Sequence, residues 1–151
     1  MAGIKKRSAG DVFCRLLFLI YCAVMLWLLF GQRIGDRVTV GSVNLVPFET
    51  LKLYRDLLSN DSKNLVRHAF INLVGNVVLF VPFGWFLPRI WNKFRGFFLV
   101  LLVVFIAVIL VETLQYFTGL GSCDVDDLIL NVPGAMLGYV VWILDSRRAK
   151  K

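Results

Sequence analysis

Residues 97–117 read FFLVLLVVFIAVILVETLQYF and are apolar without interruption as far as Val111. A transmembrane helix needs roughly 20 such residues to cross the hydrocarbon core of a bilayer. Three further apolar stretches have a similar length, at residues 12–30, 68–88 and 128–144. The sequence therefore predicts an all-α polytopic membrane helix bundle with about four transmembrane helices, in one domain over residues 1–151.

The first apolar stretch follows Lys5, Lys6 and Arg7, an arrangement also found in secretory signal peptides. It is longer than the apolar region of a typical signal peptide, and no A-x-A cleavage pattern follows it. We therefore predict that residues 12–30 form a retained membrane helix.

Basic residues give the chain a net charge of +7, and nearly all of them lie between and outside the apolar stretches. This placement is typical of topology signals that face anionic lipid headgroups, and it leaves no basic face for a nucleic acid. If the N-terminus is cytoplasmic, the segments on that side hold ten Lys and Arg in 26 positions, and the segments on the other side hold six in 47. The sequence predicts a multi-pass membrane protein with both termini cytoplasmic, membrane lipids as partners and no nucleic-acid partner.

The first external segment, residues 31–67, is too long to be a simple connection. After Pro47, apolar residues recur at helical spacing, at Leu51, Tyr54, Leu57 and Leu58. The pattern predicts a short helix that lies on the membrane surface, and the alternative is a disordered loop.

Polar residues inside the apolar stretches are the candidates for function, because buried polar groups are costly in a membrane. Helical spacing places them on common faces, and ideal helix rise places all of them in the outer half of the bilayer. The predicted polar cluster consists of His68, Asn72 and Asn76, of Glu112 and Gln115, and of Asp124, Asp126, Asp127 and Asn131. Gly75, Gly134 and Gly138 are predicted to let neighbouring helices approach closely.

The chemistry of this cluster is open at the level of sequence. Asp-x-Asp-Asp with a membrane glutamate offers oxygen ligands that suit Mg²⁺ or Ca²⁺, or a pair of carboxylates for acid–base work. Alternatively, Asp124 or Asp127 caps the helix that follows, and Asp126 is solvated in the loop. Cys123 is not expected to be a nucleophile, because adjacent Asp124 opposes thiolate formation.

Four motifs in this order resemble the VanZ-like family: NLVPF at 44–48, NLVGNVVLFVPFG at 72–84, ETLQ at 112–115 and DVDDLILNVPG at 124–134. The resemblance covers about residues 12–144. One departure is visible, because such proteins often carry Gly-Arg before the acidic run, where this chain has Leu120 and Gly121. An arginine that paired with the acids would have to be replaced here by other donors.

The resemblance implies a protein of the bacterial cell membrane, in a family whose founding member is associated with resistance to the glycopeptide teicoplanin. Our first hypothesis is a non-enzymatic protein that binds an amphiphile, either a lipid-linked cell-wall precursor or the glycopeptide, at the outward polar cluster. The alternative is a membrane enzyme that modifies a lipid-linked envelope intermediate with a divalent cation. Transport is a third hypothesis, for which a single short bundle shows no inverted repeat.

Overall fold

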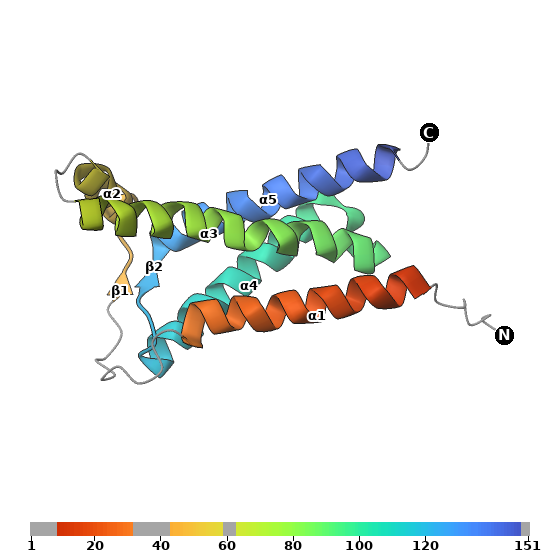
Figure 1. Ribbon diagram of the computed structural model, residues 1–151, viewed down its shortest axis with the longest axis horizontal. Helices are drawn as coiled ribbons and strands as arrows, with labels where there is room; N and C mark the ends of the chain where they lie inside the picture. The colour runs from red at the N-terminus through yellow and green to blue at the C-terminus, as the bar shows by residue number, and fades with distance from the viewer. Residues whose placement is uncertain (1–8, 32–42, 59–62, 149–151) are drawn as a thin grey trace.

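The computed structural model describes residues 9–31, 43–58 and 63–148, without the side chains of Leu58, Leu65, His68 and Ala69. Four long helices make up most of this part of the chain (Figure 1): α1 (Ala9–Phe30), α3 (Lys63–Ile90), α4 (Phe97–Thr118) and α5 (Val125–Arg148). The shorter elements are β1 (Val43–Asn44), α2 (Glu49–Leu58), the 3-10 helix η2 (Asn92–Arg95) and β2 (Cys123–Asp124).

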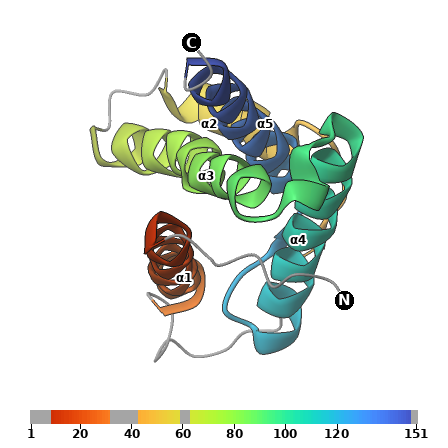
Figure 2. The same cartoon turned by 90° about the vertical axis from the view of Figure 1, so that its right-hand side faces the viewer.

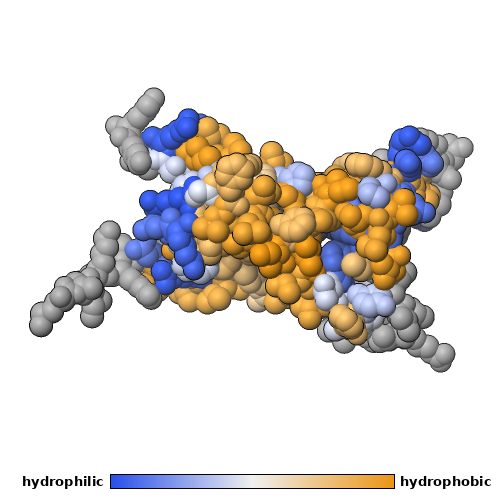
Figure 3. Space-filling view, turned by 180° about the vertical axis from the view of Figure 1, so that it is seen from behind, coloured by the Kyte–Doolittle hydropathy of each residue, from blue (hydrophilic) through white to orange (hydrophobic). Residues whose placement is uncertain are grey.

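The prediction of an all-α bundle with four membrane spans is confirmed. The spans run over Ala9–Phe30, Phe70–Ile90, Phe97–Thr118 and Val125–Arg148, each long and apolar enough to cross a bilayer. Figure 3 shows apolar residues in a broad band across the middle of one face, with hydrophilic residues towards both ends. All four helices are longer than their predicted apolar stretches, α4 by Thr118 alone.

Helix α3 contains two prolines, a residue that usually kinks or ends a helix. Both Pro82 and Pro88 lie inside the helix, which ends at Ile90. Proline cannot bond the carbonyl four residues earlier, so polar groups of neighbouring helices often assist such a segment. One turn before Pro82, the Tyr21 hydroxyl of α1 donates a hydrogen bond of 2.6 Å to the Leu79 carbonyl.

Helices α3 and α5 form the most extensive helix pair, and glycines set the distance between them. A Cβ atom at Gly134 or Gly138 of α5 would overlap the carbonyl oxygen of Val77 or Val81 on α3. The prediction for these two glycines is confirmed. Gly75 does not play this role in the described part of the chain, where no atom lies within 4 Å of a Cβ built there.

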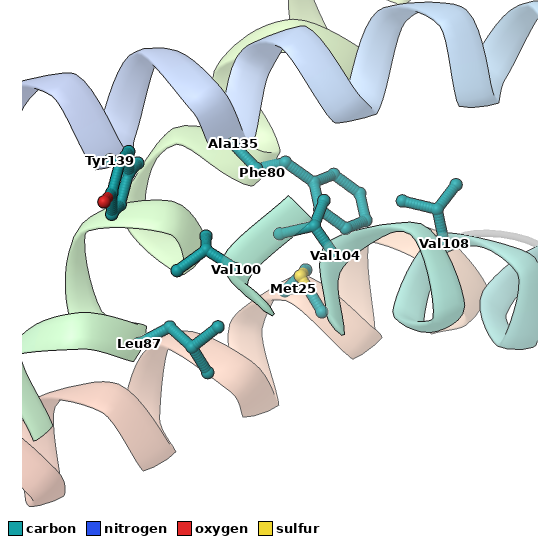
Figure 4. Close-up of a cluster of buried hydrophobic side chains, with 8 residues drawn as sticks. All are labelled: Met25, Phe80, Leu87, Val100, Val104, Val108, Ala135 and Tyr139. Carbon is teal, nitrogen blue, oxygen red and sulfur yellow. The ribbon is translucent and has the colours of Figure 1, made fainter. Parts of the chain in front are cut away.

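The core lies where all four long helices converge (Figure 4). Phe80 of α3, Val104 and Val108 of α4, and Ala135 of α5 are almost completely buried, and α1 adds Met25. Most of the remaining surface of α1 is exposed, and Figure 2 shows this helix beside α3, apart from α5. Lipid therefore covers much of α1 in a membrane.

The bundle has two chemically different ends. Helix α1 begins and α5 ends at what we call the basic end, together with η2, which connects α3 and α4 (Figure 1). There Arg89 pairs with Asp145 at 3.1 Å. The opposite end carries β1, β2 and α2 and is called the acidic end, because α5 begins there with Asp126 and Asp127 in its first turn.

Candidate functional site

A two-residue parallel strand pair joins the segment between α1 and α3 to the start of α5. We keep the name external segment for it, after its predicted position. Val43 pairs with Cys123, and Asn44 pairs with Asp124. The sequence did not predict these strands. They bring the NLVPF motif against the acidic motif, two of the four stretches that carry the family resemblance.

Asp124 is buried and gathers several donors around its carboxylate. One oxygen accepts Nδ2 of Asn44 at 3.2 Å and the backbone N–H of Asp126 at 2.9 Å. The other oxygen accepts the Thr50 hydroxyl at 2.6 Å. Asp124 thus caps the first turn of α5, as one of the predicted alternatives had it, and also holds the external segment.

Asp126 is completely buried, with 0% of its surface exposed, so the interpretation of a solvated loop residue is wrong. Its two oxygens accept the backbone N–H groups of Phe48 at 2.5 Å and of Leu51 at 3.0 Å. These groups lie at the start of α2, where helix N–H groups have no partner within the helix. Asp126 of α5 therefore caps the N-terminus of α2 and holds α2 against α5.

Helix α2 confirms the predicted short helix in the external segment. Its apolar residues Leu51, Tyr54 and Leu57 are half-buried, and α2 packs mainly on α3. Nδ2 of Asn72 on α3 donates to the Tyr54 hydroxyl at 3.2 Å. Asn72 therefore positions α2, while the predicted contact of this helix with the membrane surface stays a prediction.

Two of the predicted polar residues connect long helices directly. Nδ2 of Asn76 on α3 donates to the Asp127 carboxylate on α5. Nε2 of Gln115 on α4 donates to the Leu29 carbonyl of α1 at 3.2 Å. Such hydrogen bonds stabilise helix association in membranes by about 0.6–2 kcal/mol each.

Glu112 lies at the centre of the acidic residues. It is 6% exposed, and its Oε2 accepts the backbone N–H of Asp124 at 3.0 Å. The carboxylates of Asp127 and Asp124 act on it electrostatically. Glu112 therefore sits in a buried region of negative charge at the acidic end.

Asn131 follows Asp127 by one helical turn, so the two side chains share a face of α5. It is 2% exposed, and its Oδ1 has no hydrogen-bond partner among the described residues. An unsatisfied buried acceptor costs about 1–3 kcal/mol, so its retention calls for an explanation.

The structure therefore divides the predicted site residues into two groups. Asp124, Asp126, Asn72 and Gln115 hold segments together through the bonds described above. We call Asn76, Glu112, Asp127 and Asn131 the inner cluster. Within it, Asn76 and Asp127 also join α3 to α5, and Asn131 shares a face of α5 with Asp127. His68 lies in α3, but its side chain is outside the described part of the chain.

Hydrogen-bond donors surround the carboxylates of Asp124 and Asp126 at this end. Elsewhere on the described surface, ion pairs join Arg55 to Asp56 and Arg89 to Asp145. Asp124 and Asp126 instead receive amide, hydroxyl and backbone N–H donors. Within residues 9–31, 43–58 and 63–148, no three His, Cys, Asp or Glu side chains are arranged to hold a metal ion.

Cys123 is expected to react slowly with thiol reagents. Burial raises the pKa of its thiol, and the negative charges of Glu112 and Asp124 raise that pKa further. Because the thiolate is the nucleophile, alkylation of a Cys14→Ser, Cys22→Ser protein should reach half its maximal rate above about pH 8.5, the ordinary thiol value. The same protein denatured in SDS is the control. A native midpoint at or below the denatured one would contradict the local electrostatics described here.

Asn44 and Thr50 were missed by the sequence analysis as part of this region. Their contribution depends on contacts across 80 and 74 residues of chain, which local patterns do not reveal. The signal that could have identified them is the NLVPF motif, which was noticed only for its resemblance to the family.

Four apolar spans and a buried polar cluster at one end define a multi-pass membrane protein with a polar site near the bilayer boundary. The chain belongs to the VanZ/LLP1 family, whose sequence model matches residues 16–145. It is similar to "Protein VanZ" of Enterococcus faecium, with 24% identity over 143 residues that cover 91% of this chain and 78% of that protein. No solved structure matches the chain.

Proposed function

We propose that this protein lowers the susceptibility of a bacterium to glycopeptide antibiotics by binding an amphiphilic envelope component at the inner cluster. The bound molecule is a lipid-linked cell-wall precursor or the glycopeptide itself. The observation that carries the proposal is Asn131, whose buried Oδ1 has no donor among the described residues. Asn131 lies one helical turn from the half-buried Asp127, which in turn acts electrostatically on the buried Glu112. Both ligand classes carry amide N–H groups that could supply this donor.

Two further observations support this function. The inner cluster lies near the end of the membrane spans, where an amphiphile places its polar part while its chain stays in lipid. The similarity to Protein VanZ agrees with the resemblance to a family whose founding member is associated with teicoplanin resistance. Neither observation depends on a metal or on a nucleophile.

Replacing Asn131 with leucine tests the proposal, because it separates stability from function. Leucine keeps the branched shape of the side chain but is larger, and it removes the unsatisfied acceptor. These two effects oppose each other, so the free energy of unfolding should change little. Teicoplanin susceptibility of a deletion strain that expresses Asn131→Leu should nevertheless match that of the deletion strain.

Asn92→Leu is the matched control, since Asn92 is exposed at the basic end, and it should protect like the wild type. Full protection by Asn131→Leu at normal abundance would overturn the assignment of the site.

The alternative enzyme, which would use a divalent cation, has less support. Its oxygen ligands would have to include Asp124 and Asp126, whose carboxylates already accept donors from the external segment. A change in envelope lipids between wild-type and deletion strains that disappears with a chelator would favour the enzyme over the binding protein.

The charge distribution also supports a proposal for the orientation of the chain in the membrane. Lys93, Arg95, Arg147 and Arg148 lie at the basic end, in η2 and the last turn of α5, and basic residues concentrate on the cytoplasmic side of membrane proteins. We expect both termini to be cytoplasmic and the acidic end to face outward. A C-terminal green fluorescent protein should therefore fluoresce and a C-terminal alkaline phosphatase should be inactive, and the reverse result would contradict this orientation.

A further inference from the structure

The external segment presents an apolar tip, residues 45–48, that no other part of the described chain covers. Leu45 is 70% exposed, Val46 is 59% exposed and Phe48 is 52% exposed, and Pro47 is exposed as well. In a soluble environment such a cluster would be unfavourable, because each of these side chains gains from leaving water. We therefore expect an apolar partner to cover the tip.

Bonds to α5 and β2 fix the depth of the tip. Asn44, immediately before it, pairs with Asp124, and Phe48, its last residue, donates its N–H to Asp126. Asp126 is the second residue of the span Val125–Arg148. The tip is thus level with the point where α5 enters the bilayer, at the boundary between headgroups and acyl chains.

The backbone of the tip is held in place before any partner binds. Val46 donates its N–H to Oδ1 of Asn44 at 3.1 Å, and Glu49 donates to the Val46 carbonyl at 3.4 Å. Phe48 adopts a φ of 66°, a left-handed conformation that is strained for a bulky residue and persists only when its surroundings impose it. The fully buried Asp126 supplies that restraint. A tip ordered in advance loses little conformational entropy when it inserts.

We propose that residues 45–48 insert into the lipid leaflet at the acidic end and anchor the external segment there. The tip is continuous in depth with the membrane-facing surface of the spans, and it contains no charged residue. Its insertion is therefore driven by apolar burial and is independent of the charge of the lipid headgroups. This inference does not depend on the proposed function, because it concerns the lipid surface and not a ligand of the inner cluster.

The test places an environment-sensitive fluorophore on Val46→Cys in a protein without Cys14, Cys22 and Cys123, reconstituted into phosphatidylcholine vesicles. Its emission should shift to shorter wavelength, and nitroxides near the top of the lipid acyl chains should quench it several-fold more strongly than aqueous iodide does. The control is the same fluorophore on Arg55→Cys. The Arg55 side chain of α2 is 74% exposed, so iodide should be the stronger quencher there.

Several results would overturn the proposal. One is quenching of the Val46 label by iodide as strong as that of the Arg55 label. A second is protection from both quenchers, which would mean that protein covers the tip. A third is insertion that occurs only with anionic lipids, which would assign the contact to basic residues of α2. Leu45→Cys gives an independent reading if the Val46 variant does not fold.

Discussion

Replacing Asp126 with alanine is expected to release the start of α2 from the bundle while leaving the four long helices folded. The variant loses the acceptor of the Phe48 and Leu51 N–H groups. Hydrogen bonds to a charged group contribute about 1.5–3 kcal/mol each, so the loss is about 3 kcal/mol or more. Since 1.4 kcal/mol corresponds to a factor of ten, hydrogen-exchange protection of the Leu51 amide should fall by about a hundredfold or more. Amides of the core helices should exchange as in the wild type.

Asp56→Ala is the matched control for this effect. It removes a carboxylate from α2 itself, but that side chain is 66% exposed and pairs with neighbouring Arg55. Exposed ion pairs contribute about 0–1 kcal/mol, so protection at Leu51 should change by less than tenfold. Equal loss of protection in the two variants would contradict the role of Asp126 as a cap.

Replacing Gly138 with alanine is expected to separate α3 from α5. The added methyl group would overlap the Val81 carbonyl oxygen, and neither partner can rotate away because both atoms are fixed to helix backbones. Insertion of one methyl group into a packed core costs about 1–3 kcal/mol, and contact with a rigid backbone places this site at the upper end of that range or above. Thermal unfolding in detergent, followed by the loss of soluble monomer, should therefore shift to a clearly lower temperature.

Gly75→Ala provides the control on the opposite helix of the same pair. Its Cβ would meet nothing within 4 Å, and alanine is favoured over glycine in helices by up to about 1 kcal/mol. Thermal stability of this variant should be unchanged or higher. If Gly75→Ala destabilised the protein as much as Gly138→Ala, the close approach of α3 and α5 would not be the cause.

Gly75 and Gly138 illustrate which features of the fold can be predicted from the sequence. Four spans could be predicted because hydrophobic length is a property of each segment alone. Which glycine meets a neighbouring helix depends on the rotation of each helix about its axis. That rotation is set by packing, so the prediction held for Gly134 and Gly138 and failed for Gly75.

The same limit applies to the acidic motif. The sequence predicted that Glu112, Asp127 and Asn131 would come together near one end, because the apolar stretches fix their depth. It could not predict that Asp126 is buried, because its donors come from residues 75 and 78 positions away. A pair of two-residue strands has no periodicity to detect, so the contact between the external segment and α5 became visible only in three dimensions.

The two groups of acids have different expected roles. Asp124 and Asp126 stabilise the external segment, so their substitution should affect structure first. Glu112 lies deeper and accepts one backbone N–H, which the amide oxygen of a glutamine could also accept. Glu112→Gln should therefore remove one of the two carboxylates of the inner cluster and keep the fold.

The most direct test of this account measures teicoplanin susceptibility of a deletion strain that expresses Glu112→Gln, with hydrogen exchange of the Leu51 amide measured on the same variant. We predict wild-type protection of the amide together with the susceptibility of the deletion strain. Wild-type teicoplanin resistance, together with normal hydrogen-exchange protection of the Leu51 amide, would contradict the assignment of function to the inner cluster. Loss of protection comparable to that of Asp126→Ala would instead contradict the division of the acids into structural and functional groups.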